Sequence, residues 1–195
     1  MKKLILLIVV GLGFLSTTNA QKIKVESGDL SFLEDLADIS VVFEYPMDMK
    51  YGKMTYETYM DKKAADREKK KEGSGEEWKE KFLGDQVRYN EKFIYALGKY
   101  TGDFFIAEDD PDYKYTMIVK TTFTEPGFQM GFRSKNSAID LEITFIETNA
   151  PDKVLATVKL SKAPGAAHPD QGERVADAYF TAGQTFGKYL KKKCL

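Results

Sequence analysis

The chain has 195 residues, with 29 Lys and Arg against 30 Asp and Glu, which gives a net charge of −1. This balance argues against a nucleic-acid partner, because nucleic-acid-binding proteins usually present a strongly basic face. A single cysteine excludes an intramolecular disulfide, and one histidine with one cysteine is too few for a typical zinc site.

The first twenty residues have the three-part organisation of a secretory signal peptide. Lys2 and Lys3 precede an apolar run over 4–15, and a small polar stretch ends at Ala20. The apolar run is shorter than the roughly 20 residues that span a membrane, and we predict no transmembrane span. We therefore expect cleavage near Ala20 and a periplasmic or secreted protein. Because Gln21 follows, where a lipoprotein carries its cysteine, we expect no lipid anchor.

The rest of the chain is predicted to form one domain preceded by a short arm. Residues 21–37 mix charged side chains with a small apolar patch, and we interpret them as a leading arm that docks weakly. Residues 38–195 have the usual size of a single domain, and a core of this size needs no disulfide.

The first strand and the first helix are predicted from different sequence patterns. Apolar and polar residues alternate over 39–45, which indicates a strand that ends before Pro46. A helix is expected over 56–71, with Thr55 as its N-cap. Its second half is almost wholly charged, which is typical of a solvated helix face.

A longer helix is expected over 76–100. Ser74 and Glu77 have the spacing of a capping box at its start. An aromatic and apolar stripe recurs at helical spacing along it, formed by Trp78, Phe82, Tyr89, Phe93, Leu97 and Tyr100.

Period-two alternation dominates the second half of the chain. Strands are expected over residues 104–107, 115–124, 128–132, 139–145 and 154–160. A final helix, capped by Asp170, is expected to run to about Lys192. Alternating strands joined by short turns indicate an antiparallel sheet with one buried face. The predicted fold is therefore α+β, a two-layer sandwich of a largely antiparallel sheet with helices packed on one face.

A cluster of methionines offers one candidate metal site. Met47, Met49 and Met54 are candidate ligands, because thioethers are soft donors that favour Cu(I). Methionine also fills irregular apolar packing. We favour packing, because charged residues and tyrosines are interleaved with the methionines.

An acidic turn over 108–112 offers another candidate metal site. Asp109, Asp110 and Asp112 supply the carboxylate oxygens that Ca²⁺ prefers. The turn lacks the ligand spacing of a calcium loop, so we favour a solvated turn. We expect no cofactor.

The sequence shows no recognisable catalytic constellation. His168 is the only histidine and lies in a loop rich in Pro and Gly, so we predict no histidine-based active site. Cys194 is interpreted as a thiol on a frayed tail, with a dimer through an intermolecular disulfide as the alternative. The many acids leave a carboxylate-dependent hydrolase open, but no particular pair is marked.

Two parts of the chain resemble known groups of proteins. Three short segments are similar to the opening of small exported proteins of unknown function from Gram-negative bacteria. They are Gly28-Asp29-Leu30-Ser31-Phe32-Leu33, Val41-Val42-Phe43-Glu44-Tyr45 and Glu57-Thr58-Tyr59-Met60. The segment from Glu173 to Lys191 resembles the last helix of periplasmic domains of the kind found at the TolB N-terminus. This resemblance implies helices on a mixed sheet, and a role in assembly or interaction.

These observations predict an exported envelope protein that is not an enzyme and that binds an envelope protein or a cell-surface polymer. One alternative is a carrier of a small ligand or a metal, and another is a carboxylate-dependent hydrolase. The polar face of the sheet helps to distinguish these three functions. Charges paired across it would indicate a solvated surface, and the residues concerned are Lys120, Asp140, Glu142 and Lys159.

Overall fold

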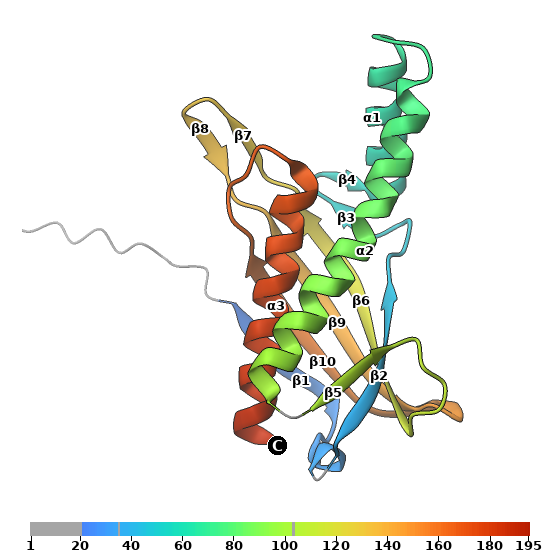
Figure 1. Cartoon of the computed structure of the whole chain (residues 1–195), viewed down its shortest axis with the longest axis vertical. Helices are drawn as coiled ribbons and strands as arrows, with labels where there is room; N and C mark the ends of the chain where they lie inside the picture. Colours follow the sequence, from blue (N-terminus) through green and yellow to red (C-terminus); the bar gives the residue numbers. More distant parts are fainter. Residues whose placement is uncertain (1–20, 35, 103) are drawn as a thin grey trace, which may run out of the picture.

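Figure 1 shows the computed structural model, which describes residues 21–34, 36–102 and 104–195. The predicted signal peptide and its cleavage site lie outside these described residues. A large, mostly antiparallel sheet carries two long helices on one face, which confirms the predicted α+β class. No helix of the described part is long and apolar enough to cross a membrane.

The strands are β1 (Lys22–Gly28), β2 (Asp38–Glu44), β3 (Lys50–Tyr51), β4 (Met54–Thr55), β5 (Phe105–Glu108), β6 (Tyr115–Glu125), β7 (Phe128–Met130), β8 (Arg133–Lys135), β9 (Ala138–Glu147) and β10 (Ala150–Pro164). The helices are α1 (Tyr56–Glu68), α2 (Ser74–Thr101) and α3 (Gln171–Lys193), and a 3₁₀ turn lies at Ser31–Leu33.

The main path of the sheet has the order β1-β10-β9-β6-β2-β5, and β7 and β8 form a separate two-stranded ribbon. The pairs β6–β9, β9–β10 and β10–β1 are antiparallel, whereas β2 is parallel to both β5 and β6. A parallel pair needs a long crossover connection. The α1–α2 hairpin belongs to that connection, which explains why it lies between β2 and β5 in the sequence.

The N-terminal segment differs from the predicted arm. Residues 22–28 form edge strand β1, which pairs along β10 from Lys22 with Ser161 to Gly28 with Ala156. Ile23 and Val25 pack against the buried core. The segment is therefore part of the sheet, where the sequence suggests only weak docking.

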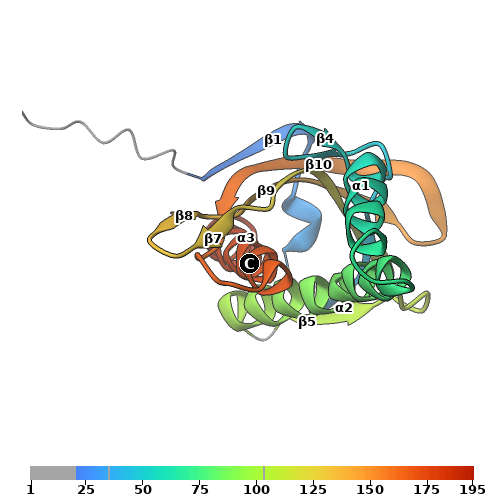
Figure 2. The ribbon, with the colours of Figure 1, turned by 90° about the horizontal axis from the view of Figure 1, so that it is seen from above.

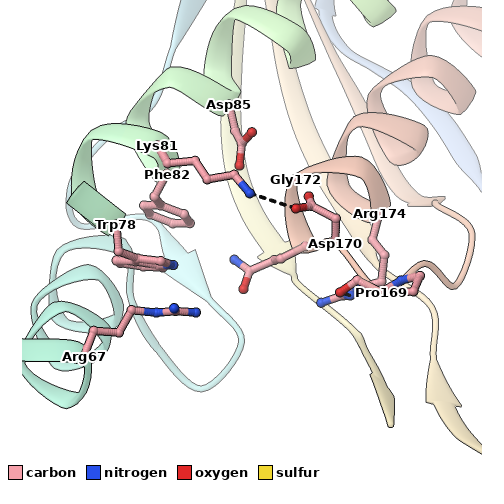
Figure 3. A pocket seen from close by; sticks show the side chains of 10 residues that line it. Arg67, Trp78, Lys81, Phe82, Asp85, Pro169, Asp170, Gly172 and Arg174 are labelled. Carbon is pink, nitrogen blue, oxygen red and sulfur yellow. Dashed lines mark hydrogen bonds and ion pairs between the residues drawn. The ribbon is translucent and has the colours of Figure 1, made fainter. Parts of the chain in front are cut away.

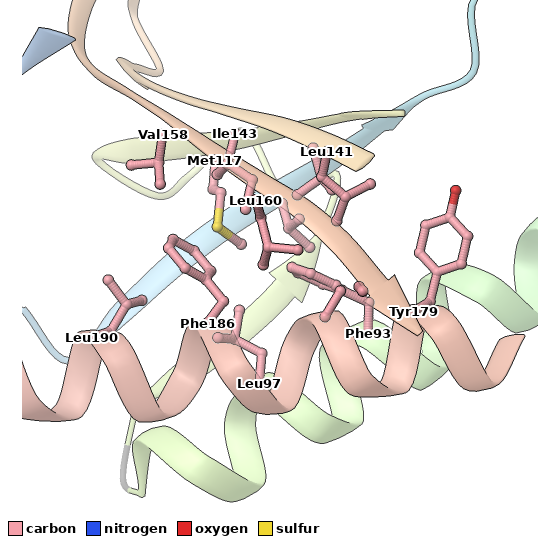
Figure 4. Packing of buried hydrophobic residues seen from close by; sticks show 14 of the residues in the cluster. Phe93, Leu97, Met117, Leu141, Ile143, Val158, Leu160, Tyr179, Phe186 and Leu190 are labelled. Carbon is pink, nitrogen blue, oxygen red and sulfur yellow. The ribbon is translucent and has the colours of Figure 1, made fainter. Parts of the chain in front are cut away.

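Two apolar clusters stabilise the part of the chain that the structure describes. The larger one, here called the sheet core, joins the inner face of the sheet to α2 and α3 (Figure 4). Its fully buried members include Phe93, Phe145 and Phe186. The smaller one, here called the hairpin cluster, lies at the base of the α1–α2 hairpin. It consists of Met49, Tyr51, Tyr56, Met60 and Phe82, together with the partly buried Tyr59 and Trp78 that pack against them.

The helix starts test the capping predictions. The Thr55 hydroxyl accepts a hydrogen bond from the Thr58 N–H at 3.1 Å, so the predicted cap of α1 is confirmed. The capping box at Ser74 is wrong, because Gly73 is the N-cap of α2. The Ser74 hydroxyl instead lies 2.8 Å from the Arg67 carbonyl and 2.6 Å from the Lys71 carbonyl, which share its single proton at the end of α1.

Candidate functional site

A cleft of about 320 Å³ lies between the α1–α2 hairpin and the start of α3 (Figure 3). In the view from above, α3 stands between the α1–α2 hairpin and the β7–β8 ribbon (Figure 2). One wall of the cleft is formed by Arg67, Trp78, Lys81, Phe82 and Asp85, and the other by Pro169, Asp170, Gln171, Gly172 and Arg174.

Two ion pairs join the walls. Lys81 Nζ lies 2.9 Å from Asp170 Oδ2 and reaches across the cleft, as Figure 3 shows. Arg88 Nη1 lies 2.9 Å from Glu173 Oε1. Asp170 also accepts from the Glu173 N–H at 3.1 Å, which confirms it as the N-cap of α3. These contacts fix the first turn of α3 against α2.

The two carboxylates of the cleft have opposite electrostatic environments. Asp85 is buried, and burial raises the pKa of its carboxyl group, with Arg88 3.6 Å away partly opposing this effect. The hydrogen bond from Lys81 lowers the pKa of Asp170. Gly172 allows the two walls to meet here, because a Cβ at this position would overlap the Asp85 carboxylate.

Gln171, the first residue of α3, is held by two tyrosines. Its side-chain nitrogen donates to the Tyr51 hydroxyl at 2.9 Å, and its oxygen accepts from the Tyr59 hydroxyl at 2.8 Å. Burial raises the pKa of both tyrosines, so the hydroxyl groups stay neutral and able to donate. The hairpin cluster therefore sets the position of α1 relative to the α3 wall of the cleft.

Arg174 is a buried arginine that holds three segments together. Its guanidinium donates to the carbonyl of Pro126 at 3.0 Å, to that of Pro169 at 3.0 Å, and to that of His168. A longer contact of 3.4 Å reaches the carbonyl of Gly127. Arg174 therefore connects α3 to the loop before it and to the base of the β7–β8 ribbon.

The predicted copper ligands lie outside this cleft. Met49 is buried in the hairpin cluster, while Met54 is half-buried and Met47 is exposed. The burial of Met49 agrees with the packing interpretation. The copper site stays a prediction.

The predicted calcium ligands also lie elsewhere, in the turn after β5. The Asp110 carboxylate accepts from the Asp112 N–H at 3.0 Å, and the Asp110 N–H donates to the Ser40 hydroxyl at 3.0 Å. Asp109 occupies the left-handed region at φ 52°. Among the residues described, no three His, Cys, Asp or Glu side chains are grouped as a metal site. The calcium site stays a prediction without structural support.

The two other residues singled out by the sequence have structural contacts. His168 is exposed, and its Nδ1 accepts from the Asp170 N–H at 3.1 Å. The frayed-tail interpretation of Cys194 is wrong, because Cys194 is the buried C-cap of α3 and its N–H donates to the Leu190 carbonyl. Burial raises the pKa of the Cys194 thiol. It also opposes the predicted disulfide dimer, which remains untested.

Charges alternate across β6, β9 and β10 on the outer face of the sheet, whereas at its edge Lys24 on β1 lies opposite Lys159. Glu142 lies opposite Lys120 on β6 and opposite Lys159 on β10, in register. The Asp140 carboxylate accepts from the Lys162 N–H at 2.7 Å. Opposite charges on neighbouring strands are the arrangement expected of a solvated face.

Sequence reasoning missed the cleft because its residues are far apart in the chain. Two signals were present. The capping pattern at Asp170 marks the start of α3, and Trp78 begins the stripe of α2. Neither signal shows that the two helices meet there.

Comparisons with known proteins add little to this description. The chain matches no protein-family model, and no curated protein matches it. A PelC dodecamer from Paraburkholderia phytofirmans aligns at 7% identity and a TM-score of 0.43, over 85% of this chain and 96% of that chain. A single-substitution variant of that PelC dodecamer aligns at 8% identity and a TM-score of 0.39, over 84% and 98%. Likenesses this weak carry no inference about function.

Proposed function

We propose that the chain is an exported, non-enzymatic interaction module of the cell envelope, which binds a protein or a surface polymer in the cleft at the start of α3. Export rests on the signal-peptide pattern of residues 1–20. The binding role rests on one observation, a cleft of about 320 Å³ whose two walls are fixed to each other before any partner arrives.

The lining of the cleft favours a polar partner. Small-molecule sites are lined mainly by apolar side chains with a few polar groups. This cleft instead presents both signs of charge, from Lys81 and Arg67 on one wall and Asp170 on the other. A segment of protein or polymer that carries its own polar groups fits such a lining better than a compact apolar ligand. Walls held by Gln171 and Arg174 also reduce the entropy lost on binding.

Site-specific photo-crosslinking in the native envelope tests this proposal. A photoreactive residue replacing Lys81 is expected to capture an envelope component. The matched control is Lys153, which is also a surface lysine in an ion pair, with Glu147 at 2.6 Å, but does not line the cleft. Products at position 81 and not at position 153 would support the proposal. Identical products at both positions, or none at position 81, would contradict it.

Trp78 offers an independent measurement, because it is the only tryptophan in the chain and lines the cleft. Addition of the captured component to the purified protein is expected to shift the tryptophan emission. Lys81→Glu is expected to weaken this response, since it reverses a charge in the cleft wall. An emission that stays constant at saturating concentrations would place the binding elsewhere.

Two acids line the cleft, Asp85 and Asp170, and the opposite directions of their pKa shifts favour a second candidate, a carboxylate-dependent hydrolase. Glycosidases use one carboxyl that stays protonated and one that stays ionised. Asp85 would supply the acid and Asp170 the base. The structural role of Asp170 as cap and ion-pair partner counts against this candidate. Release of reducing ends from envelope polysaccharide, abolished by both Asp85→Asn and Asp170→Asn, would establish it.

A further inference from the structure

The β7–β8 ribbon ends in an apolar tip that is uncovered in the described part of the chain. Its exposed fractions are 41% for Phe128, 70% for Met130 and 95% for Phe132. Gly131, at φ 56°, and Phe132 form the turn between the two strands. Turns usually carry Gly, Asn, Asp, Ser or Pro. A phenylalanine at this apex contributes nothing to the core, so its exposure needs another explanation.

The base of the ribbon is firmly held, in contrast to its tip. The Arg174 guanidinium donates to the Pro126 carbonyl at 3.0 Å. The Glu125 carboxylate accepts from Lys135 Nζ at 2.6 Å and from the Gly127 N–H at 3.2 Å. The fold therefore determines where the apolar tip points.

Positive charge accompanies the tip. Register pairs Phe128 with Lys135 and Met130 with Arg133, so the two basic side chains lie on the same face as the two apolar ones. Residues 128–135 contain no acid. Arg133 therefore places a cationic side chain beside the apolar apex, 5.7 Å from the centroid of the Phe132 ring, while the charge of Lys135 is paired with Glu125 at the base of the ribbon.

The turn of the α1–α2 hairpin adds positive charge at the same end of the molecule. It carries three consecutive lysines, Lys69, Lys70 and Lys71, followed by Glu72, whereas residues 61–80 as a whole contain seven Lys or Arg and seven Asp or Glu. Figure 1 shows the α1–α2 hairpin and the β7–β8 ribbon projecting from the same end of the domain. An apolar tip and a basic tip are thus presented together.

We propose that this end of the molecule docks on the surface of an anionic lipid bilayer. Phe128, Met130 and Phe132 would enter the interface, while the basic side chains would lie at the headgroup phosphates. A short apolar anchor binds membranes only marginally, and a basic patch is the second signal that makes binding stable. Protein hot spots lie at the centre of well-packed pockets. An isolated, protruding apex favours a fluid lipid interface over such a pocket.

Vesicle co-sedimentation tests this proposal. The protein should begin at Gln21, because the apolar run of residues 1–20 would bind lipid by itself, and the described fold is contained in the remainder. We expect sedimentation with phosphatidylcholine vesicles that contain phosphatidylglycerol, and much less with phosphatidylcholine alone. Added salt should weaken the binding, because it screens exposed charges.

Two sets of variants separate the apolar and basic contributions. The triple variant Phe128→Ser, Met130→Ser, Phe132→Ser is expected to weaken vesicle binding at least about tenfold. The charge reversals Lys69→Glu, Lys70→Glu and Lys71→Glu are each expected to lower the affinity for anionic vesicles by up to about fivefold.

A matched control replaces exposed apolar residues outside the ribbon, with Val87→Ser, Phe105→Ser and Val154→Ser. This control should bind vesicles like the parent protein. Circular dichroism should show that all variants are folded, since every substituted side chain is exposed.

Phe132→Trp in a Trp78→Phe background reports directly on the tip. Its emission is expected to shift to the blue on anionic vesicles and to be quenched by lipids brominated in their acyl chains. Absent vesicle binding, or vesicle binding that the triple serine variant retains, would overturn the proposal. The same holds if the tip variant binds vesicles normally but loses an envelope protein, because the tip would then contact that protein.

Discussion

The sheet core and the hairpin cluster have different roles in the same molecule. The sheet core is sealed, with Phe93 and Phe145 fully buried between the sheet and its two helices. The hairpin cluster is rich in tyrosine, and its hydroxyl groups bond to polar side chains at the edge of a cleft, as with Tyr51 and Gln171. The first cluster therefore mainly determines whether the chain folds, and the second mainly determines where the walls of the cleft lie.

The largest effect is expected in the sheet core. Phe93→Ala should lower the free energy of unfolding by about 3–5 kcal/mol, because it removes a fully buried ring and leaves a cavity. Phe93 also makes an edge contact with Phe43, with ring centroids 5.7 Å apart. Denaturant unfolding measures the change. Phe105→Ala, at an exposed ring, is the control and should stay within about 0.5 kcal/mol.

Arg174→Met should rank next, because it affects the junction between the core and the cleft. Methionine keeps much of the volume but leaves the carbonyls of Pro126 and Pro169 without their donor. We expect a loss of about 1–3 kcal/mol. Amide hydrogen exchange should also accelerate in the β7–β8 ribbon. Unchanged exchange there would show that Arg174 does not hold the ribbon.

Tyr59→Phe should mainly disturb the cleft. It removes the hydroxyl that donates to Gln171 and should cost about 1 kcal/mol of unfolding free energy. Binding at the cleft should weaken in parallel, as measured by Trp78 emission. Tyr95→Phe alters an exposed tyrosine on α2 and should change neither quantity. If both variants behave alike, the hairpin cluster has no special role at the cleft.

The smallest changes in stability are expected from the ionisation of Asp85 and Asp170, and the two changes should have opposite signs. The pKa of Asp85 is higher in the folded state than in the unfolded state. The protein therefore loses stability as the pH rises from the unfolded-state pKa of Asp85 through its folded-state pKa. Asp85→Asn should therefore raise neutral-pH stability, with the gain vanishing below the ordinary pKa of about 3.9. The pKa of Asp170 is lowered, so its contribution exists above the unfolded pKa and disappears as pH falls through the folded one.

Asp170→Asn provides the comparison for this measurement. Asparagine is an equally good N-cap, so the variant chiefly removes the charge that pairs with Lys81. At neutral pH, this variant should lower the free energy of unfolding by less than about 1 kcal/mol, which is typical of exposed ion pairs. Thermal melts across the acidic range should show the two variants changing stability in opposite directions. Changes of the same sign would mean that the two carboxylates share one environment.

Local features of the fold could be predicted from the sequence. The helical stripe that includes Trp78 and Phe93 anticipates α2 to within a few residues, because periodicity is a local property. Strand β1 was missed, since its alternation is short and nearly half of its residues are charged. The parallel position of β2 was also missed, because no local pattern shows which later strand becomes its neighbour.

The candidate site was less accessible to sequence reasoning than the fold. Asp170 was recognised as a cap, but its ion pair with Lys81 joins residues 89 positions apart. The burial of Asp85 depends on Gly172, from another helix, coming close enough to exclude water. The exposed Phe132 looked like part of an ordinary strand, because alternation cannot show that a ribbon leaves the sheet.

The sheet topology also has a consequence for the order of folding. Within the described residues, β1 pairs with β10, and β2 pairs with β5 and β6, so both N-terminal strands depend on later parts of the chain. Contacts between such distant segments form slowly. A chain that emerges N-terminus first therefore leaves β2 without partners until β5 and β6 follow, and β1 without its partner until β10 follows. Late closure of the sheet is compatible with transport of an unfolded chain, the route that the predicted signal peptide implies.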